Sequence, residues 1–129
     1  MTQTAAEMVG QAMAEIESVS PTVAFEEMSS NGVVFLDVRE PVEWEHHIAG
    51  AVEVPRGLLE FAADPASPRH KAELDPGGRV IVYCRSGARA ALATLTLRTL
   101  GFENVANLEG GSAAWKEAGL PTDEHHADV

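Results

Sequence analysis

Two short segments that are apolar without interruption constrain the fold of this chain more than any other feature. Residues 33–36 and 80–83 consist only of valine, isoleucine, leucine and aromatic side chains, and polar residues follow each of them. A strand that is apolar on both faces is typical of a parallel sheet covered by helices on both sides. Because segments with helical spacing alternate with such strands, we predict an α/β domain with a mostly parallel central sheet.

The remaining elements are predicted from apolar spacing, helix caps and breakers. In chain order they are an amphipathic helix over residues 4–18, a short helix beginning at Ser20-Pro21, one strand over residues 48–55, an irregular connection over residues 62–78, a helix over residues 88–100, a strand over residues 105–108 and a final helix around Trp115. The predicted organisation is an N-terminal amphipathic helix (1–16) packed on or extending the domain, one domain (17–121) and a flexible acidic tail (122–129). Methionines on the N-terminal helix leave open a second interpretation, an adaptable surface for a partner.

The second apolar strand ends at the only cysteine of the chain. The loop that joins it to the next helix reads Cys84-Arg85-Ser86-Gly87-Ala88-Arg89. The first amides of a helix lack intrahelical partners, and the helix dipole is positive there, so a tight loop can direct several N–H groups at an anion. Gly87 permits a backbone conformation that is closed to most residues. We expect the thiol, flanked by Arg85 and Arg89, to ionise more readily than a free cysteine.

A single cysteine after an apolar strand can also be an inert core residue. The distribution of charge favours a reactive cysteine instead. The formal net charge is −11 and only 9 residues are lysine or arginine, yet Arg85 and Arg89 lie in the cysteine loop. The acidic balance argues against nucleic acid as a partner, whereas the local positive charge predicts an anionic substrate.

Three further residues follow predicted strands and are candidates to support the site. Asp37 and Arg39 come directly after the strand at 33–36, and Arg56 follows the strand at 48–55. The carboxyl ends of parallel strands meet at one edge of a sheet. Asp37 is therefore placed either to orient an arginine of the cysteine loop or to form an ion pair that supports a loop. Arg56 is either an anion contact or a surface arginine.

The location and cofactor content are predicted from what the sequence contains. One cysteine excludes an intramolecular disulfide and fits a reducing compartment. No segment is apolar enough to span a membrane, and the N-terminus lacks the basic start of a signal peptide. The adjacent histidine pairs His46-His47 and His125-His126 have no metal-binding spacing. We predict a cytoplasmic protein without a metal, a cofactor or a membrane partner.

Four motifs in this order resemble the single-domain rhodaneses, the thiosulfate sulfurtransferase-like family. They are Leu36-Asp37-Val38-Arg39-Glu40, His47-Ile48-Ala49-Gly50-Ala51, the cysteine loop, and Glu109-Gly110-Gly111 followed by Ala114-Trp115. The resemblance extends over about residues 16–121. One difference is His46, where the family usually has a glycine.

The resemblance implies a three-layer sandwich with a central, mostly parallel five-stranded sheet and helices on both faces. It implies that Cys84 is the sulfur-carrying nucleophile, that residues 85–89 supply amides to a persulfide or a substrate anion, and that Asp37 is a buried acidic residue that steadies the site. The partners would be a small anionic donor such as thiosulfate and a thiol or cyanide acceptor. The protein would be a monomer or a weak homodimer.

Two other functions compete with sulfur transfer. Cysteine phosphatases and arsenate reductases also use a Cys–Arg anion loop, but only four residues separate Cys84 from Arg89, one fewer than in the familiar phosphatase loop. The other alternative is a regulatory binding domain, because a fold does not determine a function. Such domains often lack the cysteine or the loop arginines, and this chain has both.

Overall fold

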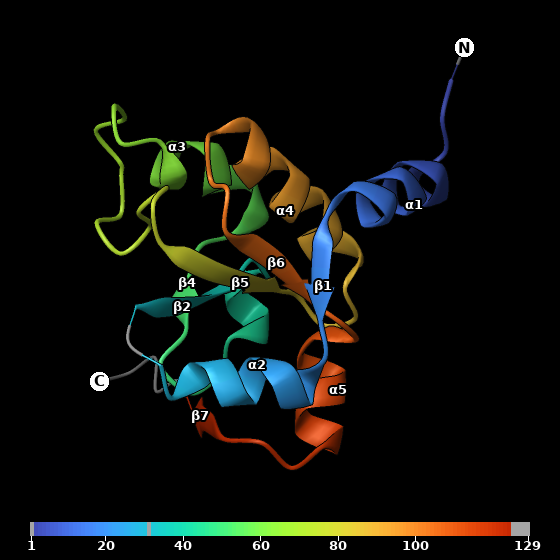
Figure 1. Ribbon diagram of the computed structural model, residues 1–129, viewed down its shortest axis with the longest axis vertical. Coiled ribbons are helices and arrows are strands. Elements are labelled where there is room, and N and C mark those ends of the chain that lie inside the picture. The colour runs from blue at the N-terminus through green and yellow to red at the C-terminus, as the bar shows by residue number, and fades with distance from the viewer. Residues whose placement is uncertain (1, 31, 125–129) are drawn as a thin grey trace.

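The computed structural model describes residues 2–30 and 32–124 (Figure 1). Within them, five parallel strands form a sheet in the order β1-β6-β5-β2-β4, and β3 pairs with β7 in a small antiparallel sheet. The strands are β1 (Glu17–Val19), β2 (Val33–Asp37), β3 (His46–Ile48), β4 (Val52–Glu53), β5 (Arg79–Tyr83), β6 (Val105–Leu108) and β7 (Thr122–Glu124). The helices are α1 (Ala5–Glu15), α2 (Pro21–Met28), α3 (Leu59–Ala63), α4 (Ala88–Thr99) and α5 (Gly111–Glu117), and the 3₁₀ turns are η1 (Pro41–Glu43) and η2 (Arg56–Leu58). None of the described helices is long and apolar enough to cross a membrane.

The sheet lies between two layers of helices, as the sequence predicts. Figure 1 shows α3 and α4 on one side of the sheet and α2 and α5 on the other. Alternation along β5 divides the core between these sides. Val80, Val82 and Cys84 pack in one buried cluster with residues of α3 and α4. Ile81 and Tyr83 pack in the other, which includes Trp115 of α5. Cys84 therefore faces the side on which α4 follows it.

The first helix ends earlier than predicted, and the next residues form a strand. A capping box between Thr4 and Glu7 begins α1, and the helix stops at Glu15. Ile16 is extended, and β1 pairs in parallel with residues 106–108 of β6. The predicted helix over 4–18 is confirmed for residues 5–15 and is wrong for residues 16–18, because this segment with its β-branched Ile16 and Val19 also suits extended structure, and β6 offers it a sheet edge.

The segment predicted as one strand over residues 48–55 is two strands in different sheets. A turn at Gly50, with φ of +75°, separates β3 from β4. Only β4 joins the central sheet, whereas β3 pairs with β7, with Ile48 opposite Thr122. Residues 122–124, which the sequence assigned to the acidic tail, form β7 and pair with β3. Residues 125–129, and with them the histidine pair at 125 and 126, lie outside the described residues.

Candidate active site

The sulfur of Cys84 lies at the end of β5 and beneath the loop that leads into α4. Its side chain is buried, and Sγ accepts hydrogen bonds from the backbone N–H groups of Gly87 (3.1 Å) and Ala90 (3.4 Å). Gly87 makes this possible by taking φ of +113° at the N-cap of α4. Two N–H groups aimed at one sulfur stabilise negative charge on it.

The rest of the cysteine loop faces solvent. Arg85, Ser86 and Ala88 are exposed. Within the described part of the chain, the structure gives no acceptor to the amides of Ser86, Ala88 and Arg89. These N–H groups, at and before the start of α4, are available to an anion.

The N-terminus of α5 holds the loop from the other side. The backbone N–H of Ser112 donates to the Cys84 carbonyl (2.8 Å), and that of Ala113 donates to the Arg85 carbonyl (3.0 Å). Gly111 allows this approach, because a Cβ at this position would overlap both of these carbonyl groups. The sequence motif contains this glycine, but its role in docking α5 against the cysteine loop is evident only from the structure.

Arg89 is held by a carboxylate that sequence reasoning did not identify. Its guanidinium donates to both carboxylate oxygens of Glu43 in η1, at 2.7 and 3.0 Å. This hydrogen bond lowers the pKa of Glu43 from 4.5 to about 2. The pKa of Arg89 lies above its ordinary value, first because of Glu43 and further because of its interaction with Cys84. Glu43 thus fixes the position of the Arg89 guanidinium.

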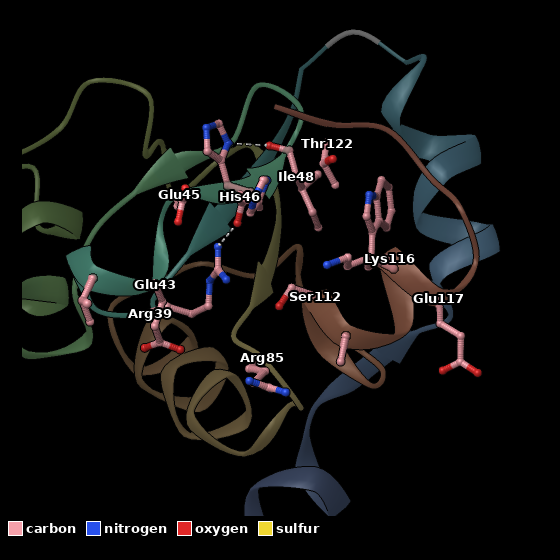
Figure 2. Close-up of a pocket in the computed structure, with 14 residues that line it drawn as sticks. Arg39, Glu43, Glu45, His46, Ile48, Arg85, Ser112, Lys116, Glu117 and Thr122 are labelled. Atoms are coloured by element: carbon pink, nitrogen blue, oxygen red, sulfur yellow. Dashed lines mark hydrogen bonds between the residues drawn. The ribbon is translucent and has the colours of Figure 1, made fainter. Parts of the chain in front are cut away.

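Asp37 is fully buried and forms an ion pair with Arg39. Of the two roles expected from the sequence, it therefore has the loop-supporting ion pair and, among the described residues, does not contact an arginine of the cysteine loop. Arg39 Nη2 donates to Asp37 Oδ2 (2.7 Å), and Nε donates to Oδ1 (3.0 Å). Arg39 also donates to the His46 carbonyl of β3 (2.8 Å), a contact drawn in Figure 2. The ion pair therefore joins the end of β2 to β3.

A second contact connects Asp37 to the cysteine. The hydroxyl of Tyr83, the residue before Cys84, donates to Asp37 Oδ2 (2.9 Å) and accepts from the Ile48 N–H (3.1 Å). Burial, and then the charge of Asp37, raise the pKa of Tyr83 well above its ordinary value, so the hydroxyl keeps its proton. Asp37 thus steadies the strand that carries Cys84.

Arg56 lies away from the loop. Its guanidinium donates to Glu60 (3.2 Å) and to Thr96 Oγ1 on α4 (3.1 Å). Thr96 is seven residues beyond Arg89, which corresponds to about 10 Å along a helix. Arg56 therefore stabilises the contact between η2, α3 and α4, and the structure does not bring it to the other candidate residues.

Asn107 of β6 is a further residue that sequence reasoning missed. It is buried, and its side-chain nitrogen lies 3.9 Å from the position that a Cβ on Gly87 would take. The same nitrogen donates to Met13 Sδ (3.4 Å), so it connects α1 to the neighbourhood of the loop. A signal was present, since Asn107 is the only polar residue of an apolar strand.

A half-open cavity of about 610 Å³ begins beside the loop at Arg85. Figure 2 shows it between η1, β3 and α5, with Arg85, Ser112 and Lys116 on its walls. Cys84 itself is covered by the loop and does not line it. In residues 2–30 and 32–124, no three His, Cys, Asp or Glu side chains are grouped to hold a metal ion.

Comparisons with known proteins identify the family of this chain. The family model described as rhodanese-like domain matches residues 20–118. A chloroplastic thiosulfate sulfurtransferase of Arabidopsis thaliana is 37% identical over 110 residues, which cover 81% of this chain and 91% of that protein. The polysulfide-sulfur transferase homodimer of Wolinella succinogenes is 34% identical, with a TM-score of 0.73 over 93% of this chain and 87% of that one.

Another similar structure has no established function. It is a protein from Rhodopseudomonas palustris described as a possible tyrosine phosphatase, with 35% identity and a TM-score of 0.87 over 95% of this chain and 96% of that one.

Some relatives are longer than this chain. It spans 55% of an uncharacterized Synechocystis protein and 22% of a probable adenylyltransferase/sulfurtransferase from Mycobacterium tuberculosis, at 36% and 33% identity. The relatives that are named as sulfurtransferases support sulfur transfer as the general chemistry. With most of its length matched by the family model and its fold shared with rhodanese structures, the chain belongs to the rhodanese-like domain family.

Proposed function

We propose that this protein is a sulfurtransferase that moves a sulfur atom from thiosulfate, or a similar anionic donor, to a thiophilic acceptor through a persulfide on Cys84. The observation that carries the proposal is the environment of Sγ. It accepts hydrogen bonds from the backbone N–H groups of Gly87 and Ala90 at the start of α4. A buried structural cysteine has no need of these two contacts.

In the first half-reaction, the Cys84 thiolate attacks the outer sulfur of thiosulfate. A bond forms between Sγ and that sulfur, the sulfur–sulfur bond of thiosulfate breaks, and sulfite leaves with the bonding electron pair. Arg85, which has no ion pair within the described residues, attracts the dianionic donor and stabilises the departing sulfite. The free amides of Ser86, Ala88 and Arg89 hold the charged outer sulfur of the persulfide.

In the second half-reaction, a nucleophilic acceptor attacks the outer sulfur of the persulfide. The bond between the two sulfur atoms breaks, and Cys84 leaves as a thiolate, ready for another cycle. Since the chain has no second cysteine, the acceptor is an external thiol or cyanide. A thiol that must stay reduced between cycles fits a reducing compartment such as the cytoplasm.

A cysteine-dependent phosphatase or arsenate reductase is the second candidate. The similarity to the protein described as a possible tyrosine phosphatase favours it. In such enzymes the arginine of the loop binds the oxyanion. Here the guanidinium of Arg89 already donates hydrogen bonds to both carboxylate oxygens of Glu43. Sulfur transfer is therefore the better-supported function. Retention of Cys84 and both loop arginines also argues against a purely regulatory binding domain.

Intact-protein mass spectrometry after incubation with thiosulfate tests the proposal. We expect a gain of one sulfur atom that a reductant or cyanide removes, and no gain in the Cys84→Ser variant. Folded, reduced protein that gains no sulfur from thiosulfate or inorganic polysulfide would contradict the proposal. Cys84-dependent hydrolysis of p-nitrophenyl phosphate by the same protein would then establish the phosphatase.

A further inference from the structure

The cavity beside Arg85 is larger than a small inorganic donor requires. Its volume of about 610 Å³ lies within the usual range of sites that bind organic ligands, about 300–1,000 Å³. Thiosulfate has only five non-hydrogen atoms and would fill a small part of this space. The cavity therefore has room for an organic molecule whose one end lies at Arg85 of the cysteine loop.

Two cations on the cavity wall have no partner in the described part of the chain. Arg85 and Lys116 make no ion pair there, although the formal net charge of the protein is −11. The third cation of the cavity, Arg39, is neutralised by Asp37. In an acidic protein, two unpaired cations in one cavity offer a binding site for a negatively charged group of a ligand, in addition to the group that reacts at Cys84.

The helix α5 places two polar side chains on the same wall. Ser112 and Lys116 are four residues apart, so they share one face of the helix. Figure 2 shows the Lys116 amino group extending into the cavity, while the Glu117 carboxylate points away from it. The other acidic side chains of the lining belong to η1 and the residues after it. Glu43 is neutralised by Arg89, and Glu45 lies on the side opposite α5.

We propose that this cavity binds the sulfur acceptor, and that the acceptor is a small organic thiol that carries a carboxylate. Lys116 and Ser112 bind the carboxylate, and the thiol end reaches the loop at Arg85. This inference rests on the proposed sulfurtransferase function and specifies its acceptor. Lys116 is then a specificity-determining residue, since it contacts a part of the acceptor that takes no part in bond changes.

The transfer step follows from this placement. The acceptor thiol first loses its proton to water and attacks as a thiolate. Its sulfur forms a bond with the outer sulfur of the Cys84 persulfide, the persulfide bond breaks, and Cys84 leaves with the electron pair. The product is an organic persulfide. Binding of the carboxylate lowers the entropic cost of bringing the two sulfur atoms together.

The test measures how fast different thiols remove sulfur from preformed Cys84 persulfide. The protein is treated with thiosulfate, or with inorganic polysulfide if thiosulfate gives no persulfide, and desalted. Discharge by 3-mercaptopropionate is then compared with discharge by 2-mercaptoethanol, which has a hydroxyl in place of the carboxylate. The ratio of the two rates is measured in the wild type, Lys116→Gln, Lys116→Arg and Lys71→Gln. Comparing ratios between proteins removes the intrinsic difference in reactivity between the thiols.

We expect Lys116→Gln to lower the ratio by about fivefold, the effect of losing one charged contact at a half-open site. Lys116→Arg should keep most of the preference. Lys71→Gln is the matched control, because it removes the other lysine of the chain, which lines a separate groove. Higher salt should also lower the ratio in the wild type.

An unchanged ratio in Lys116→Gln, or an equal fall in Lys71→Gln, would overturn the inference. Failure of this kind is distinct from failure of the proposed function, since persulfide formation is measured first. A protein that takes up sulfur but shows no preference for the carboxylate refutes only the inference. A protein that forms no persulfide with either donor refutes both.

Discussion

Replacing Gly111 with alanine tests whether α5 positions the cysteine loop. Gly111 has φ of +60°, where alanine costs about 1–2 kcal/mol. Its Cβ would lie 2.6 Å from the carbonyl carbon and oxygen of Arg85 and closer still to the Cys84 oxygen. Because such contacts essentially never fall below 3.0 Å, α5 and the loop must separate by at least about 0.4 Å.

The size of the effect follows from these contacts. Overpacking of this kind costs about 1–3 kcal/mol. Together with the cost of the left-handed backbone conformation, we expect the free energy of unfolding to fall by about 2–5 kcal/mol. The reaction should suffer as well, because a 1 Å misplacement can slow a reaction by about a hundredfold. For the smaller displacement here, we expect formation of the Cys84 persulfide to slow by about tenfold or more.

The matched control is Gly119→Ala. Gly119 also has a positive φ, of +72°, but a Cβ there would meet nothing within 4 Å. It should lose only about 1–2 kcal/mol of stability and take up sulfur at the wild-type rate. Urea denaturation measures stability, and alkylation by iodoacetamide reports the reactivity of Cys84 whatever the function. Equal loss of stability in both variants, with wild-type reactivity of Cys84 in Gly111→Ala, would refute the reasoning that α5 positions the loop.

Two further predictions concern the contacts that surround the sulfur. Glu43→Gln should lower the free energy of unfolding at pH 7 by about 0.5–1 kcal/mol, since the pair with Arg89 is partly exposed. Because the pair lowers the pKa of Glu43 from 4.5 to about 2, this difference should be complete above about pH 5 and vanish as the pH falls towards 2. Urea midpoints of the two proteins should therefore converge in acid, and a constant difference would contradict the assignment. Tyr83→Phe should lower the free energy of unfolding by about 1–3 kcal/mol, because it leaves the buried Ile48 N–H without an acceptor and removes a hydrogen-bond donor to Asp37. A variant as stable as the wild type in urea would show that these contacts do not stabilise the fold.

Long-range pairing explains where the sequence-based prediction of the fold failed. The strands β2 and β5 were predicted closely, because their apolar residues require burial on both faces wherever they lie. The short strands β1, β3 and β7 were not, because segments of three residues have too few side chains to distinguish a helix, a strand and a frayed end. Each becomes a strand only because a distant partner offers free backbone groups, β6 for β1, and β3 and β7 for each other.

The candidate site shows the same division. Cys84, Gly87 and the start of α4 are neighbours in the chain, so local sequence was enough to predict a cysteine at a junction of strand, loop and helix. The resemblance to rhodaneses added the prediction that Cys84 is the nucleophile. Arg56 was grouped with the site because it follows a strand, but its side chain had nearer partners in Glu60 and Thr96.

The sequence by itself determined the class of fold and the position of Cys84 between a buried strand and a helix, since both depend on burial and on residues adjacent in the chain. Tertiary structure alone decided the surroundings of the sulfur. Glu43 binds Arg89, which lies 46 positions later in the chain. Asp37 accepts a hydrogen bond from Tyr83, also 46 positions later and next to Cys84. Gly111 lets the start of α5 pack directly against the carbonyl groups of the cysteine loop. The physical reason is that parallel strands bring their carboxyl ends to one edge of the sheet. Which side chains meet at that edge depends on strand order, and local sequence does not encode strand order.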